Sequence, residues 1–332
     1  MSDIAKMAGV SKSTVSRALK NDSRVKLETK NKILKIADKY NYKPNKVAQA
    51  LAENNSKIIA VMLPSAPRSV SDPFFLEFLH GINNIAYQKG YSLSIPPVEQ
   101  GNFASFKKAN QNLNADGIIL TEPRLNDPRL KYLKENKIPF VFNGNPMTGD
   151  DSAWVDTDNQ LGAYQAVEYL IKKGHRKIAA VTGPFDLIAG KYRLEGYYQA
   201  LKENDLEINK DWIFESDFTE KGAYLTAKKL LKYQSEITAV FAANDLMALG
   251  IIKSLKDAGL KIPEDFSLTA YDSIKLGEYI DPPLTTIASR SLEKGEKSAE
   301  LLIKLIEGEE IESNQILFPP ELIIRESVRS NF

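Results

Sequence analysis

From Lys57 onward, short apolar segments alternate with amphipathic ones, and this alternation limits the fold more than any other feature of the sequence. Hydrophobic residues at successive positions are typical of strands buried on both faces, which are the strands of parallel sheets covered by helices. The predicted strands are residues 58–63, 91–95, 117–120, 140–142, 178–182, 239–242 and 268–271, and the predicted helices between them include 75–89, 162–173, 193–204, 221–232 and 246–258. The pattern predicts a doubly wound α/β architecture.

This α/β part is longer than one ordinary folding unit. It spans about 270 residues, whereas single domains usually contain about 100 to 150. Residues 154–162 offer a crossing between two halves of the part. We therefore expect two α/β subdomains.

The first twenty residues predict two short helices joined by a turn at Gly9. Ile4, Ala5 and Ala8 share one face of the first helix by the 3.6-residue period, and the second helix is apolar on one face only. Ser11 stands where the second helix needs a side-chain acceptor for its free amide groups, and glycine suits the end of the first. This spacing is typical of a helix-turn-helix, which places its second helix in a DNA major groove.

A third helix is expected over residues 27–40, because an apolar stripe runs between its lysines and the Asn41–Pro44 segment ends it. Asn45 can then cap a short segment over residues 46–52, before a polar linker at 53–56. A helix of about two turns is unstable alone in water. We therefore expect this segment to become helical only when contacts with another part of the protein or with a partner stabilise it.

Charge is concentrated at the N-terminal end. Residues 1–55 hold 12 lysines and arginines against 5 aspartates and glutamates, whereas the remaining 277 residues hold 32 against 38. The net charge of +1 therefore hides a basic module on a mildly acidic body. A basic module at one end fits attraction to the phosphates of nucleic acid.

The sequence contains no cysteine, so disulfides and thiolate metal sites are excluded, and no metal site is expected. No apolar run approaches the roughly 20 residues of a membrane span, and the N-terminus lacks the apolar stretch of a signal peptide. We expect a cytoplasmic protein without membrane contact.

Five segments resemble, in order and spacing, the lactose and galactose repressor (LacI/GalR) family of bacterial transcription regulators. They are the helix-turn-helix run and residues 45–52, 193–197, 244–250 and 282–287. The resemblance implies a homodimer in which each chain has a DNA-binding headpiece, a hinge helix and a periplasmic-binding-protein-like core. It also implies an effector held between two core subdomains.

The resemblance assigns expected DNA contacts. Lys12, Ser13 and Arg17 fall on positions that read base edges, and Leu51 falls on the hinge leucine that enters the minor groove as a wedge. Phosphate contacts, which position a domain without reading sequence, are expected from Thr14, Tyr42, Asn45 and the nearby Lys46.

The resemblance also assigns an effector site that mixes aromatic rings with charged and amide groups. A sugar suits such a set, because its ring faces need planar apolar surface and its hydroxyls need polar partners. The expected residues are Phe74, Phe75, Asn143, Arg193, Phe218, Asn244 and Asp272, with Trp154 and Phe185 as further aromatic candidates. Structural alternatives stay open, since Arg193 could cap a helix and the two phenylalanines could belong to a core.

The sequence-based expectation is thus a sequence-specific repressor of carbohydrate genes, released from a pseudo-palindromic operator by a sugar. The alternative is a regulator whose DNA binding a corepressor or a phosphocarrier protein strengthens. The expected divisions are a headpiece over 1–44, a hinge helix and linker over 45–56, a core N-subdomain over 57–157 and 287–316, and a core C-subdomain over 158–286 and 317–332.

Two other classes of protein fit less well. An enzyme would have only His80 and His175 as histidines, without metal-ligand spacing, and the loop 183–190 lacks the spacing and hydroxyl of a phosphate loop. We therefore expect neither catalysis nor a cofactor. A free sugar-binding protein is contradicted by the basic module and by the missing export signal.

Overall fold

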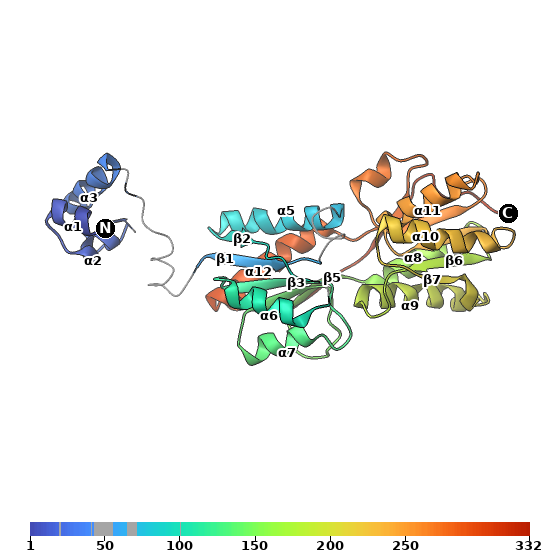
Figure 1. The fold of residues 1–332 in the computed structure, drawn as a ribbon, viewed down its shortest axis with the longest axis horizontal. Helices are drawn as coiled ribbons and strands as arrows, with labels where there is room; N and C mark the ends of the chain where they lie inside the picture. The colour runs from blue at the N-terminus through green and yellow to red at the C-terminus, as the bar shows by residue number, and fades with distance from the viewer. Residues whose placement is uncertain (20, 41, 43–55, 65–71, 100) are drawn as a thin grey trace. The chain divides into compact units, whose positions relative to one another are not determined.

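A computed structural model describes residues 1–19, 21–40, 42, 56–64, 72–99 and 101–332, which form two compact units, residues 1–56 and 57–332 (Figure 1). The expected hinge helix and its residues Asn45, Lys46 and Leu51 lie outside the described residues.

The described residues of the first unit form a headpiece of three helices, as predicted. Its helices are α1 (Ser2–Ala8), α2 (Lys12–Leu19) and α3 (Leu27–Lys39). They enclose a small core in which Ile4, Val15, Ala18 and Ile33 are almost fully buried. Gly9 ends α1 with a φ of 72°, a left-handed conformation that glycine adopts without steric cost.

The second unit contains two six-stranded sheets. The first sheet has the order β11-β5-β4-β3-β1-β2 and is parallel throughout. Its strands are β1 (Ile58–Met62), β2 (Ser92–Ser94), β3 (Gly117–Thr121), β4 (Phe140–Asn143), β5 (Trp154–Thr157) and β11 (Gln315–Phe318).

The second sheet has the order β12-β10-β9-β8-β6-β7, and only the pair of β12 with β10 is antiparallel. Its strands are β6 (Ile178–Thr182), β7 (Ile213–Glu215), β8 (Ala239–Ala242), β9 (Ser267–Asp272), β10 (Thr285–Ala288) and β12 (Glu321–Ile323). The short 3-10 helices are η1 (Lys210–Trp212), η2 (Leu231–Tyr233) and η3 (Lys275–Glu278).

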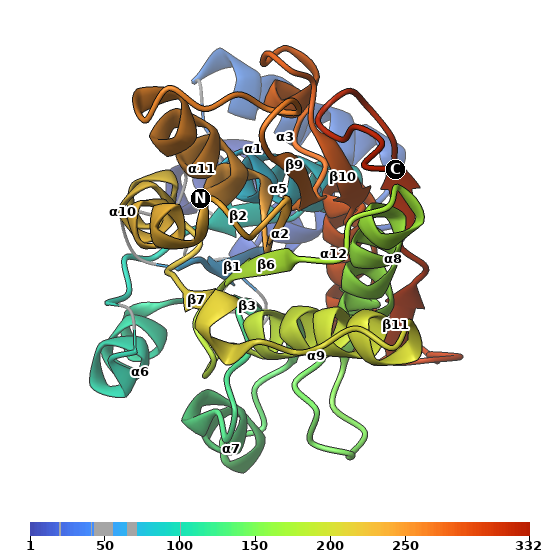
Figure 2. The ribbon, with the colours of Figure 1, turned by 90° about the vertical axis from the view of Figure 1, so that its right-hand side faces the viewer.

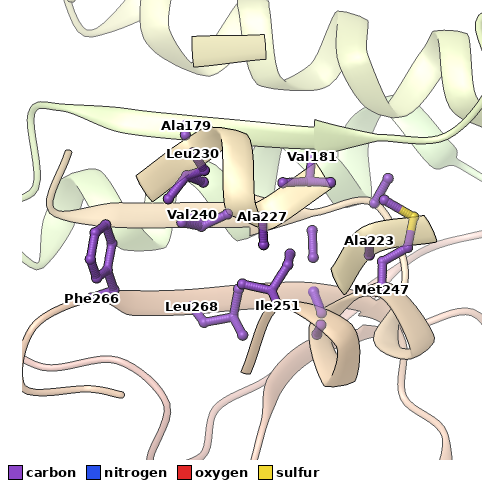
Figure 3. Close-up of a cluster of buried hydrophobic side chains, with 14 of the residues drawn as sticks. Ala179, Val181, Ala223, Ala227, Leu230, Val240, Met247, Ile251, Phe266 and Leu268 are labelled. Atoms are coloured by element: carbon purple, nitrogen blue, oxygen red, sulfur yellow. The ribbon is translucent and has the colours of Figure 1, made fainter. Parts of the chain in front are cut away.

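Helices cover both faces of each sheet, as the doubly wound prediction requires (Figures 1 and 2). The first sheet packs between α5 (Pro73–Gln88) with α12 (Ser291–Glu307) and α6 (Phe103–Asn112) with α7 (Pro128–Glu135). The second packs between α8 (Asn159–Lys172) with α9 (Ile188–Glu203) and α10 (Glu220–Leu230) with α11 (Asp245–Asp257). Figure 3 shows Val240 and Leu268 of the second sheet facing Ala227 of α10 and Ile251 of α11.

The chain crosses between the sheets three times, and two expected subdomain boundaries need correction. One crossing follows β5, which ends at Thr157. The boundaries expected at 286/287 and 316/317 fall inside β10 and β11, because β10 pairs with β9 of the second sheet and β11 pairs with β5 of the first. The crossings therefore lie between β10 and α12 and between β11 and β12. No helix of the described residues is both long enough and apolar enough to cross a bilayer.

Glycines allow the paired helices on the sheets to approach closely. A Cβ at Gly295 of α12 would stand 2.1 Å from the carbonyl oxygen of Phe78 in α5, and one at Gly81 would stand 2.1 Å from the carbonyl oxygen of Leu292. Gly196 of α9 and Gly250 of α11 have equally close backbone neighbours in α8 and α10. Side chains at these positions would force the backbones apart.

We predict that Gly295→Ala lowers the free energy of unfolding by about 1–3 kcal/mol, the usual cost of overpacking a core. Urea unfolding of the full chain, followed by the fluorescence of the buried Trp154 and Trp212, measures the loss. Lys304→Ala, at an exposed position of the same helix, is the control and should change stability by less than about 0.5 kcal/mol. Equal effects of the two substitutions would contradict the packing argument.

Candidate functional site

Helix α2 presents a polar face to solvent. Lys12, Ser13 and Arg17 are exposed, whereas Val15 and Ala18 of the same helix are buried in the headpiece core. The hydroxyl of Ser11 accepts a hydrogen bond of 3.2 Å from the amide of Thr14, as expected of the residue before a helix. The exposed face thus carries two cations and a hydroxyl on a rigid helix.

The expected phosphate contacts are only partly described. Thr14 is half-buried on α2, and its hydroxyl lies 2.9 Å from that of Ser11. Tyr42 is half-buried and packs against the headpiece core, and its amide donates to the carbonyl of Ala37. Both residues have part of their surface available to solvent.

A pocket in the second unit lies where strands of both sheets end. It is lined by residues that follow β3 and β8 and by residues at the ends of β4, β5 and β9. The starts of four helices complete the lining. Ligands of open α/β sheets bind beyond the carboxyl ends of the strands. The lining residues are Asp72, Phe74, Phe75, Glu122, Pro123, Asn143, Gly144, Asp156, Asn159, Leu187, Ile188, Ala189, Arg193, Phe218, Asn244, Asp272 and Lys294.

Several contacts hold the side chain of Arg193 in the pocket. Its guanidinium donates to Asn159 Oδ1 at 2.9 Å, to the carbonyl of Ala243 at 2.5 Å and to Asp272 Oδ1 at 3.2 Å. It also lies 3.7 Å from the centre of the Tyr271 ring. These contacts come from several elements, so Arg193 is held in one orientation and joins the end of β9 to the starts of α8 and α11.

Two positions close to Arg193 have unusual backbone. Asp272 has a φ of 107° and Phe218 a φ of 62°, conformations that cost an L-residue about 1–3 kcal/mol. Space for the Phe218 ring depends on Gly183, where a Cβ would stand 2.1 Å from the ring. Asn244 donates to the carbonyl of Phe218 and caps α11 through the amide of Met247. The fold therefore sets the positions of these side chains by local strain and close packing.

A buried carboxylate and a buried ammonium face the same pocket. Asp156 accepts hydrogen bonds from the amides of Asn145 and Thr157 and from the side chain of Asn159. Burial raises the pKa of Asp156, and the charge of Lys294 opposes that shift. Burial likewise lowers the pKa of Lys294, which is 4% exposed.

The pocket also has an unsatisfied acceptor. Asn143 ends β4 and is 6% exposed, and its side-chain oxygen has no hydrogen-bond partner among the described residues. A buried acceptor in this state costs free energy until a donor reaches it. By contrast, Asp72 caps α5 by accepting from the amide of Phe74.

The two subdomains touch beside the pocket. Arg124, in the segment after β3, forms an ion pair with Asp186, in the segment after β6. The backbones run antiparallel here, with the amide of Leu125 donating to the carbonyl of Asp186 at 3.1 Å. Contacts between the two subdomains thus close this side of the pocket.

Seven of the nine expected effector residues line this pocket, and two do not. Trp154 is 8% exposed and packs with Phe142 and Leu130 in the core on the α6 and α7 face of the first sheet. Phe185 is 42% exposed, and only its backbone amide is held, by Glu215. The aromatic character of these residues suggested the site, but Trp154 is a core residue and the Phe185 side chain faces solvent.

Sequence reasoning missed several lining residues, above all Asp156, Asn159 and Lys294. Asp156 and Asn159 sit at a strand end and helix start that the sequence analysis treated as a crossing. Lys294 lies in α12, and nothing in the sequence pattern indicated that this helix would lie near the site. Among the described residues, no three histidine, aspartate or glutamate side chains are grouped as a metal ion would require.

Comparison with known proteins identifies both units. Residues 1–45 match the model of bacterial regulatory proteins of the lacI family, and residues 167–328 match a periplasmic binding protein-like domain. Over 98% of its length the chain is 34% identical to the HTH-type transcriptional repressor PurR of Aliivibrio salmonicida, covering 98% of that protein. It is 35% identical to the repressor CytR of Escherichia coli K12, with 99% of this chain and 96% of CytR covered.

The chain belongs to the lacI family of bacterial regulatory proteins. The expectation of a DNA-binding transcriptional repressor of this family, with a helix-turn-helix headpiece and a two-subdomain α/β core, is confirmed.

Solved structures of the family agree with this architecture. The lac repressor dimer bound to operator and the anti-inducer ONPF matches with a TM-score of 0.87 at 28% identity, over 98% of each chain. A complex of the regulator CelR with cellobiose matches with a TM-score of 0.76 at 28% identity, also over 98% of each chain. A family member from Enterococcus faecium with bound ribose matches with a TM-score of 0.72 at 29% identity, over 83% of this chain and 100% of that one.

A buried carboxyl outside the pocket supports its strained turn. Asp245 is fully buried at the start of α11 and accepts from the amide of Ile274 at 2.8 Å and from the hydroxyl of Thr286 at 2.5 Å. Burial, followed by the nearby charge of Asp272, raises the pKa of Asp245 well above its usual range. Asp245 therefore holds the chain just after Asp272 at an electrostatic cost.

This raised pKa predicts a pH dependence of stability. A group with a raised pKa in the folded state contributes stability below its unfolded pKa and loses it as pH rises through the folded pKa. Asp245→Asn removes the charge but keeps two partners, because its oxygen can accept from the Ile274 amide while its NH2 group donates to the Thr286 hydroxyl. The free energy of unfolding of the variant, relative to that of the wild type, should therefore increase as pH rises from 4 to 8. Urea unfolding at each pH measures this difference.

Asp257→Asn provides a control of opposite sign. The hydrogen bond from Lys253 lowers the pKa of the exposed Asp257, so this substitution should lose relative stability, by a small amount, over the same pH range. A constant difference between Asp245→Asn and wild type at all pH values would show that Asp245 does not titrate as argued.

Proposed function

We propose that this protein is a cytoplasmic homodimer that represses transcription by binding a pseudo-palindromic operator, and that a small molecule in the core pocket, a sugar or sugar derivative, controls this binding. The observation that carries the proposal is one chain that joins a basic helix-turn-helix to a pocket built jointly by two subdomains. A dimer of headpieces would read two half-sites related by two-fold symmetry.

On the DNA side, we propose that Arg17 reads a base edge together with Lys12 and Ser13, because the three are exposed on α2. Arginine donates to both acceptors of guanine in the major groove. Thr14 and Tyr42 would contact phosphates, as would Asn45 and Lys46, and Leu51 would enter the minor groove. The last three roles rest on the family resemblance alone.

On the effector side, we propose that the aromatic and polar lining divide the recognition of a sugar. Phe74, Phe75 and Phe218 offer ring faces to apolar surface of the ligand. Arg193 and Asp272 would bond a hydroxyl pair, and Asn143 and Asn244 further hydroxyls. The family members bound to cellobiose and to ribose support a sugar as the ligand.

Control by the effector follows from where its contacts lie. Phe74 and Asn143 belong to the first subdomain and Arg193 and Asp272 to the second, so a ligand in the pocket favours one spacing of the two. A ligand shifts DNA affinity only by its differential affinity for two arrangements, usually about 1–3 kcal/mol. Linkage allows either sign, so induction and corepression are both within this mechanism.

Two expectations stand apart from this proposal. The phosphocarrier partner finds no support among the relatives and structures described above and is not part of it. We propose further that the core binds its ligand without chemical change, in keeping with the repressors that the chain resembles.

Arg17→Ala should lower the preference for operator over random DNA by about 5- to 150-fold, the equivalent of one bidentate base contact. Gel shifts at two salt concentrations measure it. Lys35→Ala removes an exposed cation from α3 and serves as the control. It should weaken binding to both DNAs alike and keep the preference. Unchanged preference in Arg17→Ala would remove α2 from the role of reading helix.

Asp272→Asn should leave operator affinity intact and abolish the response to any sugar that shifts it in the wild type. The substitution removes one charge of the Arg193 pair at the pocket and leaves the headpiece unchanged. Operator binding is titrated with cellobiose, ribose and common monosaccharides, with Asp257→Asn as an exposed control. A normal response in Asp272→Asn would exclude Asp272 from the effector site.

A further inference from the structure

Among the described residues of the pocket lining, Arg193 and Lys294 are the cations, and Lys294 is the one without an ion pair. It lies in the first turn of α12, is 4% exposed and is part of the pocket lining. Among the described residues, its ammonium has no hydrogen bond and no carboxylate oxygen within 4.0 Å, and its one ring contact is with Phe74, at 4.9 Å from the ring centre. An ammonium has three donors, and an aromatic face satisfies none of them fully.

Four carboxylates line the pocket together with Lys294, namely Asp72, Glu122, Asp156 and Asp272, and Asp72 caps α5. The charged groups that act most strongly on Lys294 have partners of their own. Asp156 accepts from two backbone amides and from Asn159, and Asp272 is paired with Arg193. Glu293 is exposed and lies 3.8 Å from Arg290. The two buried carboxylates favour the charge on Lys294 at longer range, and Arg193 opposes it.

The position of Lys294 on its helix adds to the imbalance. The first turn of a helix carries a partial positive charge, where an anion is favourable and a cation is not. Burial also lowers the pKa of Lys294. A largely buried lysine without an ion pair costs free energy at this place, and an anionic oxygen of a ligand would recover part of it.

We propose that the ligand of this pocket carries an anionic oxygen group, a carboxylate or a phosphate, which accepts hydrogen bonds from the Lys294 ammonium. The unpartnered Asn143 oxygen lines the same pocket and requires a donor, which a sugar hydroxyl supplies. The two groups together specify a hydroxylated acid, either a sugar acid or a sugar phosphate. This inference rests on the proposed function and narrows its effector.

The test compares sugars that differ only in charge. Thermal unfolding of the full-length protein is followed with glucose, glucuronate and glucose 6-phosphate, and with ribose, ribonate and ribose 5-phosphate, at constant ionic strength. At least one acid should raise the Tm of the wild type more than its neutral parent does. Glucuronate and ribonate report on a carboxylate, and the two phosphate esters on a phosphate.

Lys294→Met keeps the length of the side chain and removes its charge, and Lys304→Met at an exposed position of α12 is the matched control. The affinity for the stabilising acid should fall about tenfold or more in Lys294→Met, the worth of a hydrogen bond to a charged group. It should be unchanged in Lys304→Met. Equal affinity in wild type and Lys294→Met overturns the inference, and so does stabilisation by neutral sugars with none by the acids.

A second measurement needs no ligand. If Lys294 is unpaired in the free protein, Lys294→Met should unfold at the same or a higher urea concentration than wild type. A lower midpoint would show that Lys294 has a stabilising role inside the protein, and the inference would fall. It also falls if no acid of the panel stabilises the wild type.

Operator binding separates this inference from the proposed function. An acid that binds through Lys294 but leaves operator affinity unchanged would support the inference and contradict effector control. A neutral sugar that shifts operator affinity equally in wild type and Lys294→Met would support effector control and contradict the inference.

Discussion

The carboxyl ends of parallel strands from two separate sheets meet at one pocket, and the rest of the core depends on this constraint. Parallel strands need a long crossover connection, usually a helix, so most of these strand ends are followed by a turn or a helix start. Turns and helix starts favour Asp, Asn and Gly, which are also groups that bind polar ligands. Asn143, Asp156, Asn244 and Asp272 all occupy such places. The topology of the sheets therefore places polar residues at the site, whichever ligand the protein recognises.

This origin explains how far the sequence could predict the structure. The strands at 178–182 and 239–242 were predicted to the residue, because buried strands consist of continuous apolar runs. Strand β5 was not recognised, since Trp154–Thr157 contains an aspartate, and β7, β10, β11 and β12 are short or lie at or beside a sheet edge. Helices began up to five residues before the predicted starts. The periodicity reports the buried stripe of a helix and not its first turn, as α9 shows.

The same reasoning explains which of the predicted site residues line the pocket and which do not. Arg193 was identified by the family resemblance, and its network with Asp272 is formed by two segments 79 residues apart that only the fold brings together. Trp154 and Phe185 were chosen for their aromatic character, which does not distinguish a ring facing a pocket from one in a core or in solvent. Lys294 was missed because its distance from the other lining residues in sequence gave no signal. Burial of a charge becomes visible only once the packing is known.

The three crossings tie the pocket to any movement between the subdomains. Asp156 lies one residue before the end of β5, and the hydroxyl of the next residue, Thr157, donates to the carbonyl of Ser289 at 2.7 Å. The Ser289 hydroxyl donates in turn to the carbonyl of Asp272. A short chain of hydrogen bonds therefore runs from one side of the pocket to the other through two crossing segments. A ligand that binds Asp156 or Asp272 and shifts its position therefore acts directly on these segments.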